Sequence, residues 1–270
     1  MTLVQASIAN NGETVIIVAD RLLTRSFGEK FPSYEFEGNS PKIISRGKVG
    51  IGFAGSALYA DMVTSELSTD ISDFDEIVGA ISNFVKNTRG SIFSDVVFKV
   101  TGISPEDFYS NPQIVPDPVR DFIYGWRMEF QLDFECIVAG FDKDKNAKIT
   151  HITEDGSIIS ATNFGVDSIG SGSLFSQIYF DQYNYEVSMP EIGSLFFAYK
   201  AKKWAEAPTG VGLKTDIILF RKYHANTEIQ NENGLMSEIN KVYEEEKERN
   251  RGIRDELLKR LIKIGSGELI

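Results

Sequence analysis

A threonine at the second position, Thr2, is the residue of this chain with the clearest chemical potential. Its side chain carries a hydroxyl, and removal of Met1 would leave a free α-amine on the same residue. A hydroxyl is a weak nucleophile until a base takes its proton, and an amine with a pKa of about 7.7–8.0 suits that task. Enzymes that remove the initiator methionine accept small side chains at position two. The alternative is that Thr2 is simply a β-branched residue that begins a strand.

The composition of the chain argues against nucleic-acid binding, metal binding and membrane insertion. The chain has 270 residues, a formal net charge of −11 and 42% hydrophobic residues, enough for a large core. An acidic chain lacks the clustered Lys and Arg that phosphate backbones require, so we expect no nucleic-acid partner. The single cysteine, Cys136, lies in an apolar run, and neither His151 nor His224 has neighbours at metal-ligand spacing. We therefore expect no metal and no cofactor. No segment resembles a signal peptide or a membrane span, which predicts a cytoplasmic protein.

A hairpin is expected to carry Thr2. Two apolar, β-branched runs, Thr2–Ile8 and Thr14–Ala19, flank the turn Asn10-Asn11-Gly12, a combination typical of a β-hairpin. Short apolar runs between turn residues predict further strands at Val49–Ala54, Glu135–Phe141, Ala147–Thr153, Ser157–Asn163 and Thr215–Phe220. Apolar residues at helical spacing predict helices after the capping residue Ser56, from Asp73 to about Asn87, over Leu174–Tyr185, over Glu191–Ala207 and from Leu235 onward.

The order of these elements predicts an α+β fold. Antiparallel strands with helices in separate blocks fit a four-layer αββα sandwich of two antiparallel sheets. We expect residues 1–230 to form one domain, with an insertion at about 91–134 in which four prolines break the pattern. Residues 231–270 are predicted to form a charged helical extension that docks on the body or on a neighbouring subunit.

Six landmarks in chain order carry a resemblance to a known family. They are the opening Thr2 with Val18-Ala19-Asp20-Arg21, then Pro41-Lys42-Ile43-Ile44, Gly50–Asp61, Val138–Asp142, Ile169–Ser173, and Glu206–Gly210 before the strand at Thr215. Together they resemble the proteasome β-subunits and their bacterial relatives, which are N-terminal nucleophile hydrolases. The resemblance covers roughly residues 2–90 and 135–222 and leaves out the insertion and the final helix.

The resemblance implies a catalytic role for four of these residues. Thr2 would be the nucleophile, and its own amine would be the general base. Lys42 would lower the pKa of that amine by charge repulsion, and Asp20 would hold Lys42 in place. The amide N–H of Gly55 would stabilise the oxyanion of the tetrahedral intermediate.

Three more residues complete the site that the resemblance implies. Ser171, Glu206 and Thr209 are expected to form a polar shell around the amine of Thr2. Glu206 and Thr209 stand at a turn where the family has an aspartate and a serine.

The function that follows is a threonine hydrolase that cleaves peptide bonds, with Thr2 exposed by removal of Met1. Two alternatives keep the same fold: an amidohydrolase acting on a non-peptide amide, and a catalytically inactive structural subunit of a proteasome-like assembly. Convergence of Thr2, Asp20 and Lys42 in space would argue against the inactive subunit. The resemblance also implies a peptide or unfolded polypeptide substrate, a homo-oligomer built as a ring or related assembly, and, by analogy, an ATPase partner.

Overall fold

The part of the chain that the computed structural model describes comprises residues 2–25, 34–37, 41–68, 70–111, 113, 115–209, 211–229 and 234–265. The chain divides into two units, Met1–Thr227 and Glu228–Ile270. The larger unit carries the candidate site residues, and the smaller one contains a long helix.

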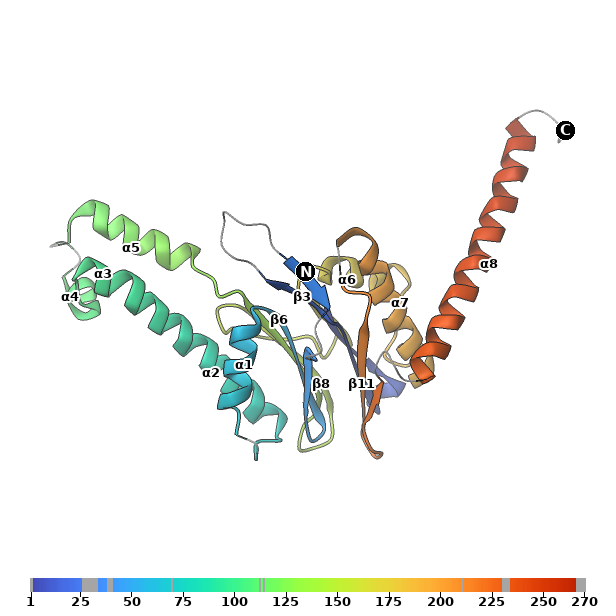
Figure 1. Cartoon of the computed structure of the whole chain (residues 1–270). Helices are drawn as coiled ribbons and strands as arrows, with labels where there is room; N and C mark the ends of the chain where they lie inside the picture. Colours follow the sequence, from blue (N-terminus) through green and yellow to red (C-terminus); the bar gives the residue numbers. More distant parts are fainter. Residues whose placement is uncertain are drawn as a thin grey trace. The chain divides into compact units, whose positions relative to one another are not determined.

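Two five-stranded antiparallel sheets form the centre of the fold (Figure 1). The first has the order β10-β1-β2-β11-β12, which are Val166–Ile169, Val4–Ala9, Thr14–Asp20, Thr215–Arg221 and Thr227–Ile229. The second has the order β5-β6-β7-β8-β9, which are Ile43–Arg46, Val49–Gly55, Phe134–Phe141, Ala147–Ile152 and Ile158–Ser160. A short ribbon follows β2 and pairs β3, Leu22–Arg25, with β4, Tyr34–Glu37. The predicted α+β class with two antiparallel sheets is confirmed.

The β1–β2 hairpin positions the start of the chain. Its turn residues, 10–12, all have positive φ, between 51° and 86°, a conformation that asparagine and glycine tolerate better than other residues. The turn sets a register in which Val4 lies opposite Ala19. One residue further along, the N–H of Asp20 donates to the Leu3 carbonyl over 3.1 Å. The predicted hairpin is confirmed, and it holds the beginning of β1 beside Asp20.

The two sheets pack face to face over an apolar core. Both sheets contribute fully buried aliphatic side chains, among them Val4, Ile17, Ile137, Ile149 and Ile169. The sheets approach closely at Gly52 of β6, where an added Cβ would lie 2.4 Å from Val4 Cγ1. A glycine is therefore needed at this position, and the close approach brings β6 directly against β1.

Helices cover the outer face of each sheet and complete four layers (Figure 1). Helices α1, Ala57–Glu66, and α2, Phe74–Phe93, pack on the second sheet. Helices α6, Ser173–Gln182, and α7, Glu191–Thr209, pack on the first. The four-layer arrangement is the one predicted.

Local sequence explains where the two helices on the second sheet begin. Asp73 caps α2, because its carboxylate accepts hydrogen bonds from the N–H groups of Asp75 and Glu76. Ser56 occupies the capping position of α1, but its side chain forms no capping hydrogen bond. Position 56 was correctly predicted as the helix start, and the side-chain cap expected there was wrong.

The segment predicted as an insertion at 91–134 is largely helical. Helix α2 continues beyond its expected end near Asn87 and passes into a π-helical turn, Ser94–Phe98. The described helices that follow are α3, Lys99–Thr101; α4, Pro105–Ser110; and α5, Asp117–Glu129. Prolines lie in the first turns of α4 and α5, where no N–H donor is needed. The segment has an apolar cluster of its own, formed by Val97, Phe98, Phe108, Val115 and Ile123.

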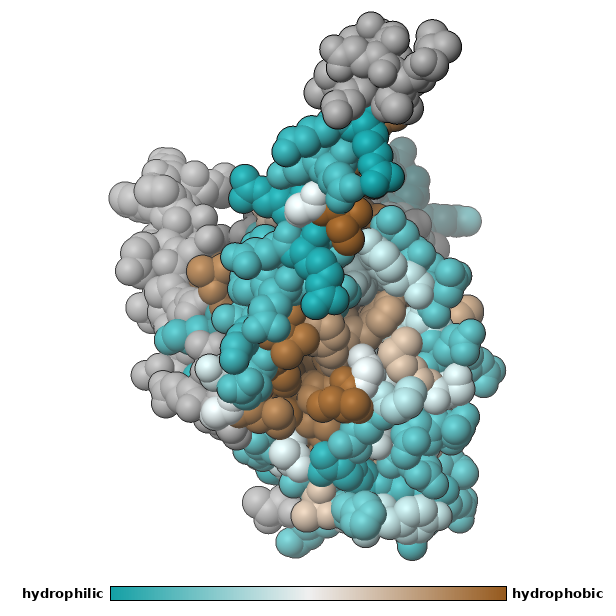
Figure 2. All heavy atoms as spheres, turned by 90° about the vertical axis from the view of Figure 1, so that its right-hand side faces the viewer, coloured by the Kyte–Doolittle hydropathy of each residue, from teal (hydrophilic) through white to brown (hydrophobic). Residues whose placement is uncertain are grey.

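The smaller unit contains α8, Gly234–Gly265, which confirms the long charged helix predicted from Leu235 onward. Its second half exposes apolar side chains at Ile253, Leu257, Leu258 and Leu261. Figure 2 shows a face of the molecule that is mainly hydrophilic, with hydrophobic side chains gathered in one region. None of the helices in the described ranges combines the length and the apolar character that crossing a bilayer requires.

Candidate active site

Thr2 lies two residues before β1, and the loop that follows β10 holds its backbone. The N–H of Gly172 donates to the Thr2 carbonyl over 3.1 Å. The nitrogen of Thr2, which in this chain joins it to Met1, donates to Ser171 Oγ over 3.0 Å. Gly170 has a φ of +85°, and an added Cβ there would lie 2.5 Å from the Thr2 carbonyl oxygen. The loop therefore fixes Thr2 through its main chain and leaves the hydroxyl for other partners.

Lys42 reaches the hydroxyl of Thr2 from the neighbouring sheet. Its Nζ lies 3.0 Å from Thr2 Oγ1 and 2.9 Å from Asp20 Oδ1. Lys42 precedes β5, and its carbonyl accepts the N–H of Phe53 from β6 over 3.0 Å, which anchors its main chain. The structure thus brings together Thr2, Lys42 and Asp20, three residues to which the resemblance assigned roles in one site.

Asp20 is the most enclosed member of the group, with no exposed side-chain surface. Its Oδ1 accepts the N–H of Leu3 over 2.8 Å as well as the Lys42 ammonium. Its Oδ2 accepts the N–H groups of Leu22 over 2.9 Å and Gly212 over 3.0 Å. A buried carboxylate held by several donors and one cation has a single orientation, and it fixes Lys42 with it.

Burial alters the acid–base properties of Lys42. Loss of hydration lowers the pKa of its ammonium below the usual 10.5, and the charge of Asp20 and the hydrogen bond to it oppose this shift. The side chain is only 8% exposed. Lys42 is therefore a largely desolvated cation that donates a hydrogen bond to Thr2 Oγ1. Its charge disfavours protonation of neighbouring basic groups.

Gly55 is the last residue of β6 and is exposed. Its φ is +94°, and an added Cβ would lie 2.4 Å from the carbonyl oxygen of Asp133. Only glycine fits there. The preceding residue, Ala54, has its Cβ 3.3 Å from the position of a Cβ added to Gly170. Because Gly170 lies against the Thr2 carbonyl, these contacts place Gly55 at the border of the Thr2 site.

Glu206 has other partners than those predicted, and the prediction for Thr209 is not tested by the described residues. Within the described part of the chain, the carboxylate of Glu206 pairs with Lys202 and Lys203 and not with Thr2 or Ser171. Thr209 is the last residue of α7, and its side chain lies outside the described residues. Of the polar shell expected around the nitrogen of Thr2, the described contact is therefore the one made by Ser171.

Several residues that support the site were not predicted. Gly212 binds Asp20 directly, and Lys202 is fully buried behind Glu206. Arg21, the residue after Asp20, forms a bidentate ion pair with Asp216 over 2.7 and 2.5 Å. A signal for Lys202 was available, because it shares a helical face with small apolar residues, Ala198, Ala201 and Ala205.

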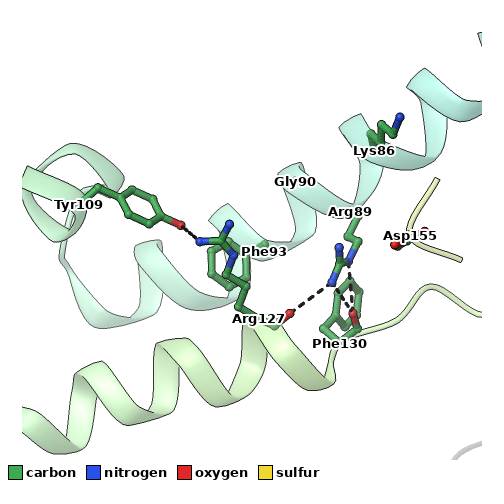
Figure 3. Close-up of a pocket in the computed structure, with 8 residues that line it drawn as sticks. All are labelled: Lys86, Arg89, Gly90, Phe93, Tyr109, Arg127, Phe130 and Asp155. Atoms are coloured by element: carbon green, nitrogen blue, oxygen red, sulfur yellow. Dashed lines mark hydrogen bonds between the residues drawn. The ribbon is translucent and has the colours of Figure 1, made fainter. Parts of the chain in front are cut away.

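A separate cavity of about 250 Å³ lies between α2 and α5 (Figure 3). Its two arginines have structural partners: Arg89 donates to the carbonyls of Arg127 and Phe130, and Arg127 donates to the Tyr109 hydroxyl. Arg89 thereby satisfies carbonyls at the end of α5, which helix geometry leaves without partners. In the described residues no group of three or more His, Cys, Asp or Glu side chains has the geometry to hold a metal.

Two antiparallel sheets between helical layers define a proteasome-like fold, in which Thr2 lies beside Lys42 and Asp20. The solved structure of Anbu (ancestral beta-subunit) from Yersinia bercovieri shares this fold, with a TM-score of 0.62 and 13% sequence identity over 93% of this chain and 96% of that one. No protein-family model matches the sequence, and no curated protein matches it. At 13% identity this likeness establishes the fold alone.

Proposed function

We propose that this protein is an N-terminal nucleophile hydrolase that cleaves peptide bonds with Thr2. One observation carries the proposal: Lys42 Nζ lies 3.0 Å from Thr2 Oγ1 and is held there by the buried Asp20. A buried ion pair of this kind requires desolvation of two charges, so it is weak evidence for stability alone. Its position at a threonine hydroxyl is better explained by chemistry at that hydroxyl.

The first step is removal of Met1, which converts the nitrogen of Thr2 from an amide into an amine. The amine keeps Ser171 Oγ as a neighbour, at the 3.0 Å separation of the present hydrogen bond. An α-amine has a pKa near neutrality, about 7.7–8.0. The Lys42 ammonium, which donates a hydrogen bond to Thr2 Oγ1, lowers the pKa of the Thr2 amine further by charge repulsion.

The second step is attack on the substrate carbonyl. The amine takes the proton of Thr2 Oγ1 as the oxygen bonds to the carbonyl carbon, and the Lys42 ammonium stabilises the negative charge on that oxygen. The carbonyl oxygen becomes an oxyanion, to which the N–H of Gly55 at the border of the site donates a hydrogen bond. Collapse of the intermediate breaks the C–N bond, and the Thr2 amine passes its proton to the departing amine.

The third step restores the enzyme. Water attacks the ester on Thr2 Oγ1 while the amine of Thr2 accepts a proton from that water. Collapse breaks the ester C–O bond and releases the carboxylic acid, and the amine returns its proton to Thr2 Oγ1, which restores the hydroxyl. Every proton transfer uses the same amine, so no histidine is required.

Two alternatives are separated from this proposal by experiment. The contact between Lys42 and Thr2 argues against an inactive structural subunit, because such a subunit has no need of a cation at that hydroxyl. A non-peptide amide as substrate is tested with a fluorogenic peptide panel beside simple amides. We expect peptide turnover by the processed protein, reduced turnover by Thr2→Ser and none by Thr2→Ala. Processing without peptide turnover would favour the other amides.

We also propose that the protein works as a homo-oligomer. Helices α6 and α7 expose large apolar side chains at Leu174, Ile178, Ile192 and Trp204, with exposed fractions from 43% to 66%. Apolar surface of this kind supports association between copies. Analytical ultracentrifugation of the purified protein tests the assembly, and a monomer at micromolar concentration would count against it.

A further inference from the structure

Lys202 is a buried lysine to which the hydrolytic scheme assigns no role. Its side chain has no exposed surface. It lies in α7, on the face that packs against the first sheet, among the buried Ala198, Ala201 and Ala205. A charged group in such a place is strongly destabilising unless it is fully paired.

The partners of Lys202 account for its burial. Its Nζ donates to the carbonyls of Gly212 over 2.5 Å and Leu213 over 3.1 Å, and to the carboxylate of Glu206. Three acceptors match the three donors of an ammonium. Burial lowers the pKa of Lys202 to about 8, and the Glu206 carboxylate opposes this shift. The ammonium is therefore the main form at neutral pH.

The turn that Lys202 holds is the turn that contacts Asp20. The N–H of Gly212 donates to Asp20 Oδ2, while the carbonyl of the same residue accepts from Lys202. An added Cβ on Gly212 would lie 2.9 Å from Asp20 Oδ2 and 2.7 Å from Leu22 Cβ. No side chain fits between this turn and Asp20, so the backbone at 211–213 rests directly on the carboxylate.

We propose that Lys202 is a positioning residue for the Thr2 nucleophile, acting through the 211–213 turn. Lys202 fixes the two carbonyls, the turn presents the Gly212 N–H to Asp20, and Asp20 orients Lys42 against Thr2 Oγ1. Two buried ion pairs, Lys202 with Glu206 and Lys42 with Asp20, are thus joined by one residue of backbone. The catalytic meaning of this link rests on the proposed hydrolase function, whereas the link itself does not.

A simpler role for Lys202 would be to neutralise Glu206. Lys203 is the matched control for that role, because it also pairs with Glu206, with its Nζ 3.0 Å from Glu206 Oε1. Its other contact in the described residues is with the ring of Tyr199, not with the 211–213 turn. Lys202→Met and Lys203→Met therefore remove the same charge beside the same carboxylate, and only the first releases the turn.

Amide hydrogen exchange of Gly212 tests the link without any need for activity. In Lys202→Met, exchange of this amide should accelerate by about tenfold or more, because the N–H to Asp20 is no longer held in place. Lys203→Met should stay within about twofold of the wild type. Unchanged protection of Gly212 in a folded Lys202→Met protein would overturn the proposal.

Reaction of Thr2 with a peptide vinyl sulfone tests the consequence for the nucleophile. In Lys202→Met the maximal labelling rate should fall by about tenfold with the binding constant unchanged, since Lys202 does not contact the peptide. Gly212→Ala should produce the same loss with Lys202 intact, and it carries the test where Lys202→Met fails to fold. Labelling at the wild-type rate by Lys202→Met or by Gly212→Ala would overturn the proposal. Failure of the hydrolase function itself is recognised separately, because the wild-type protein would then not be labelled.

Discussion

The ion pair between Lys42 and Asp20 yields the most quantitative prediction. Lys42→Met leaves the Asp20 carboxylate fully buried, and its remaining partners within the described ranges are backbone N–H donors. Removing one member of a buried pair typically destabilises a protein by about 3–5 kcal/mol, because the other charge stays buried and uncompensated. For a unit of this size, Met1–Thr227, that corresponds to a melting temperature lower by about 10 °C. The reverse variant, Asp20→Asn, should be similarly destabilised.

The double variant distinguishes this reasoning from a general loss of packing. Asp20→Asn with Lys42→Met leaves no unpaired charge, so its destabilisation should be smaller than the sum of the singles by about 2–3 kcal/mol. Urea unfolding at pH 7, followed by tryptophan fluorescence and circular dichroism, measures all four proteins. Lys143→Met, at an exposed lysine in the loop between β7 and β8, controls for the loss of one positive charge. Additive effects, or a Lys42→Met protein within about 1 kcal/mol of the wild type, would refute the reasoning.

Three further predictions follow from individual contacts. Gly170→Ala places a Cβ 2.5 Å from the Thr2 carbonyl oxygen and should slow vinyl sulfone labelling of Thr2 by about a hundredfold. Gly79→Ala is the control, because no atom lies within 4 Å of its new Cβ. It should leave labelling unchanged and raise the free energy of unfolding by about 0.5–1 kcal/mol. The pKa of Lys202 falls from 10.5 to about 8 on folding. Between pH 8 and 10.5 the unfolded chain therefore keeps a proton on Lys202 that the folded chain has lost. The free energy of unfolding of the wild type, relative to Lys202→Met, should rise by up to about 3 kcal/mol over this range. A difference between the two proteins that does not change with pH in urea titrations would contradict this. Arg89→Met removes the donor to the carbonyls at the end of α5 and should lower stability by about 1–2 kcal/mol while Thr2 labelling is unchanged.

The central part of the fold could be predicted because local sequence and tertiary structure agree there. The turn at 10–12 has the residue types that positive φ requires, so the hairpin could be predicted from the sequence alone. Short apolar runs between turn residues predicted β6, β7, β8, β9 and β11, with shifts at their ends. The strands β3, β4, β5, β10 and β12 were not predicted. The contact of Lys42 with Thr2 came from the resemblance, because nothing local predicts which segment of the second sheet lies beside the start of the first.

Other features depend on contacts that are invisible in the sequence. Lys202 and Lys203 are adjacent, yet the first is fully buried and the second is 16% exposed, because the helical face at Ala198 and Ala205 turns inward. The helical segment after α2 was expected to be irregular because its prolines were interpreted as breaks. Pro105 lies instead in the first turn of a helix, a position that proline favours.

The central claim is that Thr2 becomes a nucleophile once Met1 is removed. Intact-mass and N-terminal peptide mass spectrometry of the purified protein, before and after incubation with a peptide vinyl sulfone, tests it most directly. We predict a chain that lacks Met1 and gains one inhibitor mass on the peptide that begins at Thr2, with no gain in Thr2→Ala. Retention of Met1 on essentially all molecules, or a processed Thr2 that never carries the adduct, would contradict the account.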